Sequence, residues 1–387
     1  MIIEWVFWTV LLLLLHSYAV YPMLAVLVGA GRGERSLQHL PGISLLVPAH
    51  NEASVIEAKI RNFHQIDYPP ELIELVIADD GSDDQTRSIV QPLTSSRVRL
   101  LESGQRGGKA AAMNRLATAA QHSYLLFSDA NVIFDPNAVR RLIDPMGNGK
   151  VGAVTGEVRL LGSDLEFSPG EELYYRLERR IQGAESRMGS VMGVDGGMYL
   201  VRQELFTPLP TDTILDDFLV SIRVMRAGRR VVYESAAKAT ESGTPTARQE
   251  FARRTRIAAG AVQLLKRRQV PRWTQPILWL QFISHKLLRW TSPLLLLILA
   301  VSNVCLILRG LHYQLLLALQ ILGLAAMLAT CWFPRLRNSL LGGVVFYFAM
   351  SQAAIAVGLL RGLLNRQAPQ WEKPTRVHPA THRDSHS

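Results

Sequence analysis

Four long apolar runs are the feature that most limits how this 387-residue chain can fold. The first, Trp5–Val28, contains no charged residue, and three more follow at Ser292–Leu308, Leu311–Trp332 and Leu340–Leu360. Each is close to the roughly 20 residues that a helix needs to cross a bilayer. The sequence therefore predicts an N-terminal transmembrane anchor over residues 1–30 and three further transmembrane helices over residues 291–362.

The charges beside the first run predict its orientation. Glu4 precedes the run, and Arg32 and Arg35 follow it. Basic residues are retained on the cytoplasmic side, so we expect the N-terminus outside and the central region in the cytoplasm, at the inner (cell) membrane. Four crossings would leave the basic tail, residues 363–387, outside, against the same rule. Either one segment is re-entrant or the tail tolerates the violation. The tail itself is expected to be disordered.

The positive charge of the chain is concentrated next to the apolar runs. The formal net charge of +10 would by itself suggest a nucleic-acid binder. Residues 41–247 nevertheless carry 22 basic and 27 acidic residues, whereas residues 248–290 carry 10 basic residues and 1 acidic residue. A basic surface beside membrane segments fits anionic lipid headgroups. We therefore expect the lipid bilayer, and no nucleic acid, as a partner.

The central region alternates short apolar runs with amphipathic segments. Strands are predicted over 43–47, 75–78 and 124–127, and helices over 51–63, 109–120 and 171–188. Repeated βα units predict a mostly parallel, doubly wound (Rossmann-like) α/β domain, which we assign to residues 40–248. Residues 249–290 are assigned to basic and interfacial helices, because residues 274–290 mix aromatic and Leu side chains with Lys286 and Arg289.

Polar residues cluster where the predicted strands end. Glu52 follows the first strand, Asp79 and Asp80 follow the second, and Asp129 and Asn131 follow the third. Any one of them could form a turn or cap a helix. Acidic residues at three successive strand ends instead indicate one crevice, where open α/β sheets bind ligands. Such a crevice needs a cation, and a divalent metal on a diphosphate supplies one.

Three other motifs each have a functional and a structural interpretation. Residues 104–109 form a glycine turn that places Lys109 at a helix start, where it can contact phosphate or belong to an ordinary turn. One of Asp216 and Asp217 is a candidate general base, or the pair is stabilised by a helix N-terminus. Gly196 and Gly197 indicate a loop approached closely by a ligand or backbone.

An arginine cluster opens the basic region. Arg253, Arg254 and Arg256 are candidates to clamp a diphosphate leaving group. The alternative is a cationic patch for the membrane surface, and different arginines can serve either purpose.

Taken in order, these motifs resemble glycosyltransferase family 2, in the membrane-bound branch that contains cellulose, hyaluronan and poly-N-acetylglucosamine synthases. The resemblance covers about residues 40–290 and rests on Val47-Pro48-Ala49-His50-Asn51-Glu52, Asp79-Asp80-Gly81-Ser82, Gly108-Lys109-Ala110, Asp129-Ala130-Asn131, Gly196-Gly197, Asp216-Asp217 and the segment His285–Trp290. It implies a GT-A fold and an inverting sugar transfer from a nucleotide donor, with UDP as the expected nucleotide.

The resemblance also implies a role for each matched position. Asp129 and Asn131 correspond to the motif that holds Mg²⁺ or Mn²⁺. Asp217, with Asp216 beside it, corresponds to the catalytic base that deprotonates the acceptor hydroxyl. The expected nucleotide-sugar site consists of Ala49, Glu52, Asp79, Asp80, Lys109, Gly196, Gly197, Arg253, Arg254 and Arg256.

There are two departures from the family pattern, of which the first concerns the metal site and the second the product. Asn131 offers one negative charge fewer than an aspartate, and Gln249 is followed by Glu250-Phe251-Ala252-Arg253 without the tryptophan of processive synthases. A shorter extension of a saccharide, or transfer to a lipid-linked acceptor, is therefore favoured over a long polymer, within envelope polysaccharide or glycolipid synthesis. Accessory export subunits are candidate partners.

Other functions remain open alternatives. They are transfer to a polyprenyl phosphate or another lipid, and a non-catalytic membrane subunit that binds nucleotide. A coupled transporter is disfavoured because the apolar runs contain no Asp, Glu or Lys.

Overall fold

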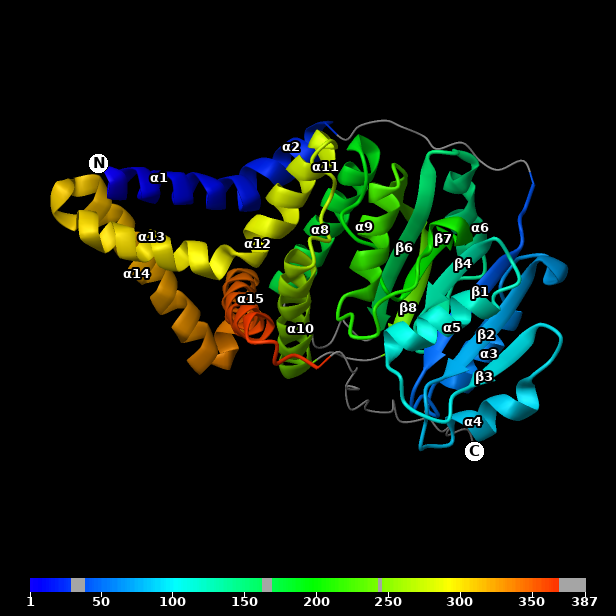
Figure 1. Ribbon diagram of the computed structural model, residues 1–387. Helices are drawn as coiled ribbons and strands as arrows, with labels where there is room; N and C mark the ends of the chain where they lie inside the picture. Colours follow the sequence, from blue (N-terminus) through cyan, green and yellow to red (C-terminus); the bar gives the residue numbers. More distant parts are fainter. Residues whose placement is uncertain (29–38, 162–168, 243–245, 369–387) are drawn as a thin grey trace.

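The computed structural model describes residues 1–28, 39–161, 169–242 and 246–368. An α/β domain lies beside a group of long apolar helices that extend away from it (Figure 1). The end of the tail, residues 369–387, for which we expect disorder, lies outside the described residues.

The described residues of the α/β domain contain an eight-stranded mixed sheet with the order β3-β2-β1-β4-β7-β6-β8-β5. The neighbours β3-β2-β1-β4 are parallel, whereas β7 is antiparallel to both β4 and β6. The Rossmann-like class is therefore confirmed, with a mixed second half. The strands are β1 (Ile43–Ala49), β2 (Ile73–Asp79), β3 (Val98–Glu102), β4 (Tyr124–Ser128), β5 (Val132–Phe134), β6 (Val151–Leu161), β7 (Met198–Arg202) and β8 (Arg230–Ser242).

Helices cover both faces of the sheet, because its strands are apolar on both sides. One hydrophobic core joins the sheet to α3 (Ile56–His64) and α6 (Ala138–Ile143). The core on the opposite face contains α5 (Lys109–Ala119), α9 (Asp216–Arg226) and part of α10 (Ala247–Lys266). Two further helices are α4 (Thr86–Val90) and the long α8 (Pro169–Met188).

The helix predicted over 51–63 begins at Ile56 instead. Asn51 has a φ of 58°, and the Glu52 carbonyl accepts hydrogen bonds from the amides of Val55 and Ile56. Residues 51–55 consequently form a turn at the edge of the sheet. This turn places the first polar strand end next to the site described below.

Four helices within the described residues are long and apolar enough to cross a membrane. The first consists of α1 (Ile2–Leu15), a π-helical turn (His16–Val20) and α2 (Tyr21–Val28). The others are α13 (Ser292–Leu306) with a 3-10 turn (Ile307–Arg309), α14 (Leu311–Trp332) and α15 (Leu340–Leu363). These helices lie where the apolar runs predict them.

The segment predicted to lie at the membrane interface forms α11 (Pro276–Gln281), a π-helical turn (Phe282–Leu287) and α12 (Leu288–Trp290). Phe282 and Trp290 are buried, and the Trp290 ring packs edge-on against Phe218 of α9. The domain boundary expected at residue 248 therefore falls inside one hydrophobic core, which α10 and α11–α12 help to build.

Candidate active site

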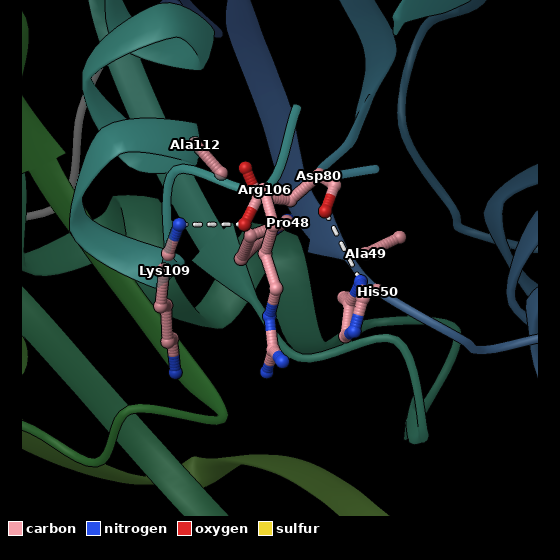
Figure 2. A pocket seen from close by; sticks show the side chains of 8 residues that line it. Pro48, Ala49, His50, Asp80, Arg106, Lys109 and Ala112 are labelled. Atoms are coloured by element: carbon pink, nitrogen blue, oxygen red, sulfur yellow. Dashed lines mark hydrogen bonds between the residues drawn. The ribbon is translucent and has the colours of Figure 1, made fainter. Parts of the chain in front are cut away.

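The carboxyl ends of β1 and β2 border a cavity (Figure 2). The two strands pair in parallel with Ala49 opposite Asp79, so the residues that follow them meet at one sheet edge. Ala49, Asp80 and Lys109, all expected at the nucleotide-sugar site, lie together here. The cavity is lined by Pro48, Ala49, His50, Asp80, Arg106, Gly108, Lys109 and Ala112.

Asp80 holds the glycine turn against the end of β2. Its carboxylate accepts hydrogen bonds from the backbone amides of Gly107 (2.9 Å) and Gly108 (2.6 Å) and from the Arg115 guanidinium (3.2 Å). Gly108 has a φ of +87°, a conformation that side chains other than glycine rarely adopt. The Asp80 carboxylate thus positions the turn that begins α5, in addition to bordering the cavity.

Asp79 and Glu52 lie below this surface and do not line the cavity. The Asp79 carboxylate is buried and binds Arg87 at 2.8 Å. Glu52 is also buried, and its backbone amide donates to the Thr86 hydroxyl at 2.7 Å. The structure therefore gives these two carboxylates a place beneath the loops that surround the cavity. The reason is that two residues of α4 bind them: Arg87 binds Asp79 at the end of β2, and Thr86 binds Glu52 after β1.

Lys109 connects the cavity with the predicted metal and base residues. Its Nζ lies 2.8 Å from Asp129 Oδ1 and 3.7 Å from Asp216 Oδ2. Burial alone would lower the pKa of Lys109, but Asp129 and Asp216 outweigh that effect and raise it. Lys109 thus places a positive charge between Asp129, which follows β4, and Asp216, which begins α9. In Figure 2 its side chain and that of Arg106 extend in the same direction from the turn.

Asp217 occupies the first turn of α9 against a glycine loop. Its Oδ1 accepts the Phe218 amide at 2.6 Å. A Cβ on Gly196 would lie 3.3 Å from its Oδ2, so this glycine allows the close approach. Burial, and then the neighbouring Asp216 carboxylate, raise the pKa of Asp217 to about 7. A pKa in this range suits a group that exchanges a proton with substrate near neutral pH.

The predicted metal pair lies on the turn between β4 and β5. The Asn131 amide donates to Glu241 Oε1 at 3.0 Å, because β8 pairs with β5 and places Glu241 opposite Val132. Burial and the Asp129 carboxylate raise the pKa of Glu241. Burial raises the pKa of Asp195, and the negative charge of Asp129 raises it further. Negative charge is thus in excess around Asp129.

This donor set fits a divalent cation held by few protein ligands. Carboxylate and amide oxygens suit Mg²⁺ and Mn²⁺, and Mg²⁺ often takes its other ligands from substrate phosphates and water. Within the described residues, no set of three His, Cys, Asp or Glu side chains converges as a complete metal centre. Asp129 and Asn131 would therefore hold the ion as an open site.

The three arginines of α10 point to different places. Arg253 binds Glu250 at 2.8 Å, and its charge acts on Asp195 and Glu241. Arg256 donates to the Ile214 carbonyl at 3.2 Å, just before the acidic pair.

Arg254 takes another direction from the diphosphate contact expected for it. It binds Glu250 at 2.8 Å, donates to the Tyr347 hydroxyl of α15, and its guanidinium lies 4.6 Å from the centre of that ring. The structure thus commits Arg254 to the contact between α10 and α15.

Several residues of this site are not among those predicted from the sequence. Asp195 lies within the glycine loop 193–197, so an acidic residue between glycines was an available signal. Glu241 and Arg115 carry no local signal, because strand pairing and loop docking bring them in. Lys59 is also new: its buried Nζ donates to Ser128 Oγ at 2.7 Å and to the Val132 carbonyl at 2.6 Å, on both sides of the metal pair.

The same fold occurs in a solved glycosyltransferase. The structure titled mannosyltransferase PcManGT from Pyrobaculum calidifontis, in complex with GDP-Man and Mn²⁺, superposes with a TM-score of 0.72. The match covers 94% of this chain and 100% of that chain at 22% sequence identity. The likeness establishes that this chain has a GT-A glycosyltransferase fold.

The sequence of this domain is similar to those of known glycosyltransferases. Residues 44–209 match the model of glycosyl transferase family 2. This chain is 27% identical over 238 residues to poly-beta-1,6-N-acetyl-D-glucosamine synthase from Staphylococcus aureus, and 25% identical over 236 residues to the enzyme of that name from Staphylococcus epidermidis. The matches cover 60% and 59% of this chain and 57% of each relative. Residues 44–209 are therefore similar to the glycosyl transferase family 2 domain.

Proposed function

We propose that this chain is a membrane-anchored inverting glycosyltransferase in which Asp217 deprotonates an acceptor hydroxyl. The observation that carries the proposal is the Asp217 carboxylate itself, which lies against Gly196 with a pKa raised to about 7. General bases work best when their pKa lies near the operating pH. The attacking oxygen then displaces the nucleotide diphosphate from the anomeric carbon, on the opposite side of the sugar.

The remaining site residues fit this reaction. The strand-end surface beside Ala49 and Asp80 is suited to contact the nucleoside, and Lys109 at the N-terminus of α5 is suited to the diphosphate. A divalent ion on Asp129 and Asn131 would offset the charge that grows on the departing diphosphate. Arg253 adds a further positive charge on the side of Asp195.

The names of the similar proteins support a proposal for the donor and the acceptor. The synthases make a polymer of N-acetylglucosamine by name, and the archaeal structure contains GDP-Man. We favour a UDP-linked sugar and a saccharide or lipid-linked hydroxyl acceptor on the cytoplasmic side of the inner membrane. Short products are supported by the Gln249–Arg253 stretch, which lacks the tryptophan of processive synthases.

The test is a donor screen on the full chain in detergent. UDP- and GDP-sugars are supplied with Mg²⁺ or Mn²⁺ or with chelator, nucleotide release is measured, and products are sized by mass spectrometry. With the accepted donor, Asp217→Asn should lower turnover by about 10²–10⁴-fold, because the general base is lost. Asp212→Asn, an exposed change just before α9, should leave turnover unchanged.

Three outcomes would contradict the proposal in different ways. Full turnover by Asp217→Asn on a hydroxyl acceptor would remove Asp217 as the base. Turnover by that variant on a polyprenyl phosphate would assign an acceptor that is already an anion. Nucleotide binding in calorimetry with no release from any donor would assign a non-catalytic binding subunit.

A further inference from the structure

The last apolar helix, α15, lies along a charged helix of the catalytic domain from Tyr347 to its C-terminal end. Residue numbers rise together along the contact, so α10 and α15 run parallel. The contacts are those of the Tyr347 hydroxyl with Glu250 (3.1 Å), the Thr255 hydroxyl with the Ala354 carbonyl (3.3 Å), and Lys266 Nζ with the carbonyls of Gly362 (2.9 Å) and Leu363 (3.0 Å). Residues 347–363 of α15 are therefore held against the same helix.

Glycines bring the two backbones into direct contact. A Cβ on Gly358 would lie 2.3 Å from the Thr255 carbonyl oxygen, and a Cβ on Gly362 would lie 2.9 Å from the Ala259 carbonyl oxygen. The buried residues of α15 form one stripe of mostly small side chains on this side of the helix. This contact is tight packing between two backbones, with no room for lipid.

The partner helix α10 belongs to the water-exposed catalytic domain. Its Gln263 accepts the Ile214 amide at 3.0 Å and donates to the Asp212 carbonyl at 2.7 Å, just before the catalytic pair. Between residues 248 and 266 it carries five arginine and lysine side chains and one glutamate. Such charges are costly in the hydrocarbon layer, so α10 must remain outside it. A helix that follows α10 in parallel remains at the same level.

The middle of α15 contacts the first residue of α13 and the π-helical turn of the first apolar helix. Gln352 lies at its centre, donates to the Tyr18 hydroxyl at 3.0 Å and accepts from the Ser292 hydroxyl at 2.7 Å. Ser292 is the first residue of α13, and Tyr18 lies in the turn before α2, which packs on α8. The centre of a spanning helix would instead lie roughly 15 Å deeper, in the middle of the bilayer. Figure 1 shows α1 and α13 side by side, with α15 foreshortened next to α10.

The other side of α15 is apolar and exposed. Leu341 is 78% exposed and Leu360 is 61% exposed. From Leu340 to Leu360 the helix has no charged side chain. An apolar face on a helix held at the level of the headgroups fits the acyl boundary of one leaflet.

We propose that α15 is an in-plane interfacial helix whose exposed face inserts into the leaflet next to the catalytic domain. The chain then crosses the bilayer three times, and its C-terminus lies on the same side as the catalytic domain. This arrangement keeps the basic tail together with Arg335 and Arg337 on one side, as the positive-inside rule requires. One of the two readings left open by the sequence, a segment that does not cross, is thereby assigned to α15.

Cysteine accessibility tests the number of crossings. In a Cys305→Ser, Cys331→Ser background, single cysteines are introduced as Ser96→Cys in the catalytic domain, Arg309→Cys between α13 and α14, and Ser387→Cys at the tail. A membrane-impermeant maleimide is applied to spheroplasts before and after lysis. We expect the positions 96 and 387 to behave alike and position 309 to be opposite. Labelling of position 387 together with position 309 would overturn the proposal, whatever reaction the protein catalyses.

Spin-label depth measures the position of the helix directly. Nitroxides at Leu341→Cys, Ala353→Cys and Leu360→Cys are compared in lipid vesicles by their collisions with oxygen and with a water-soluble nickel complex. An in-plane helix gives three similar, shallow depths, whereas Leu322→Cys in α14 gives a deep one. A maximum of depth at residue 353 would show a spanning helix and overturn the proposal.

Discussion

At the scale of residues, the main feature of the site is a group of buried carboxylates whose charges water does not screen. Asp129, Asp195, Asp216, Asp217 and Glu241 influence one another, and burial raises the pKa of Asp217, Asp195 and Glu241. Lys109 is the cation between Asp129 and Asp216. The carboxylates of this cluster suit a metal cation, and Lys109 suits the negative charge of a phosphate.

The raised pKa of Asp217 predicts the pH dependence of the reaction. Because the base must be deprotonated, kcat/KM should fall as pH falls through about 7. Asp216→Asn removes the neighbouring negative charge, so it should move the midpoint of this acid limb to lower pH. The measurement is the midpoint of the pH profile under saturating metal. An unchanged midpoint in Asp216→Asn would mean that the limb reports another group.

The raised pKa of Asp217 also predicts how the stability of the fold changes with pH. A carboxyl group with a raised pKa stabilises the fold while it is protonated, and this contribution is lost as pH rises through about 7. The Asp217→Asn variant of the activity test should therefore unfold at a higher temperature than the parent protein at pH 8 and at a similar temperature at pH 4.

Lys59 stabilises the turn between β4 and β5, which carries the predicted metal ligands Asp129 and Asn131. Burial lowers its pKa to about 7, although Asp129 opposes that effect. Lys59→Met should cost about 1–3 kcal/mol of stability, because the Ser128 hydroxyl and the Val132 carbonyl lose a buried partner. It should also raise the Mn²⁺ concentration needed for half-maximal activity. Lys150→Met, at an exposed position, is the control; equal behaviour of the two variants would remove this role.

At the scale of elements, glycine spacing decides which helices touch. Gly358 lets α15 approach the Thr255 carbonyl, whereas a Cβ on Gly323 of α14 would meet no atom within 4 Å. The two helices have similar hydropathy, 1.8 and 2.1. Their packing partners therefore differ because of shape, and hydropathy alone does not separate them.

This contrast predicts opposite effects for two matched substitutions. Gly358→Ala should lower the unfolding temperature in detergent and reduce sugar transfer, because it pushes α15 away from α10. Gly323→Ala should be neutral or stabilise by roughly 0.5–1 kcal/mol, the usual gain on replacing an unconstrained helical glycine. Thermal unfolding and turnover of both variants are measured together, and equal effects would argue against the close contact.

At the scale of the whole molecule, the basic stretch after residue 248 is structurally part of the catalytic domain. Ala261 and Leu264 of α10 share a core with Phe218 and Leu219 of α9. Lys266 caps the C-terminus of α15 by donating to the carbonyls of Gly362 and Leu363. Domain and membrane helices thus meet through α10.

This packing predicts how fragments behave. A fragment of residues 40–248 should be insoluble or unfold without cooperativity, because it lacks Leu264, Phe282 and Trp290, each worth about 1.5–3 kcal/mol when buried. A fragment of residues 40–290 in mild detergent should recover a cooperative transition by circular dichroism. Cooperative unfolding of the shorter fragment would show that the core is complete before α10.

Much of the protein is determined by local patterns in the sequence. The apolar runs, the βα alternation and the strand-end carboxylates follow from spacing and side-chain type, so the predicted strands, α14 and the grouping of Ala49, Asp80 and Lys109 could be found from residues alone. The folding of the Rossmann-like half brings those strand ends to one edge. The family resemblance added the expected roles of Asp129, Asn131 and Asp217.

Only the tertiary structure decides what depends on contacts between distant segments. Glu241 reaches Asn131 because β8 pairs with β5, Asp79 turns to Arg87 and away from the cavity, and Arg254 turns to Tyr347. The placement of α15 is of the same kind. Length and hydropathy show only that α15 is apolar, and an apolar helix can lie in the middle of a bilayer or at its surface. The depth of α15 relative to the bilayer is determined by the helix that it packs against.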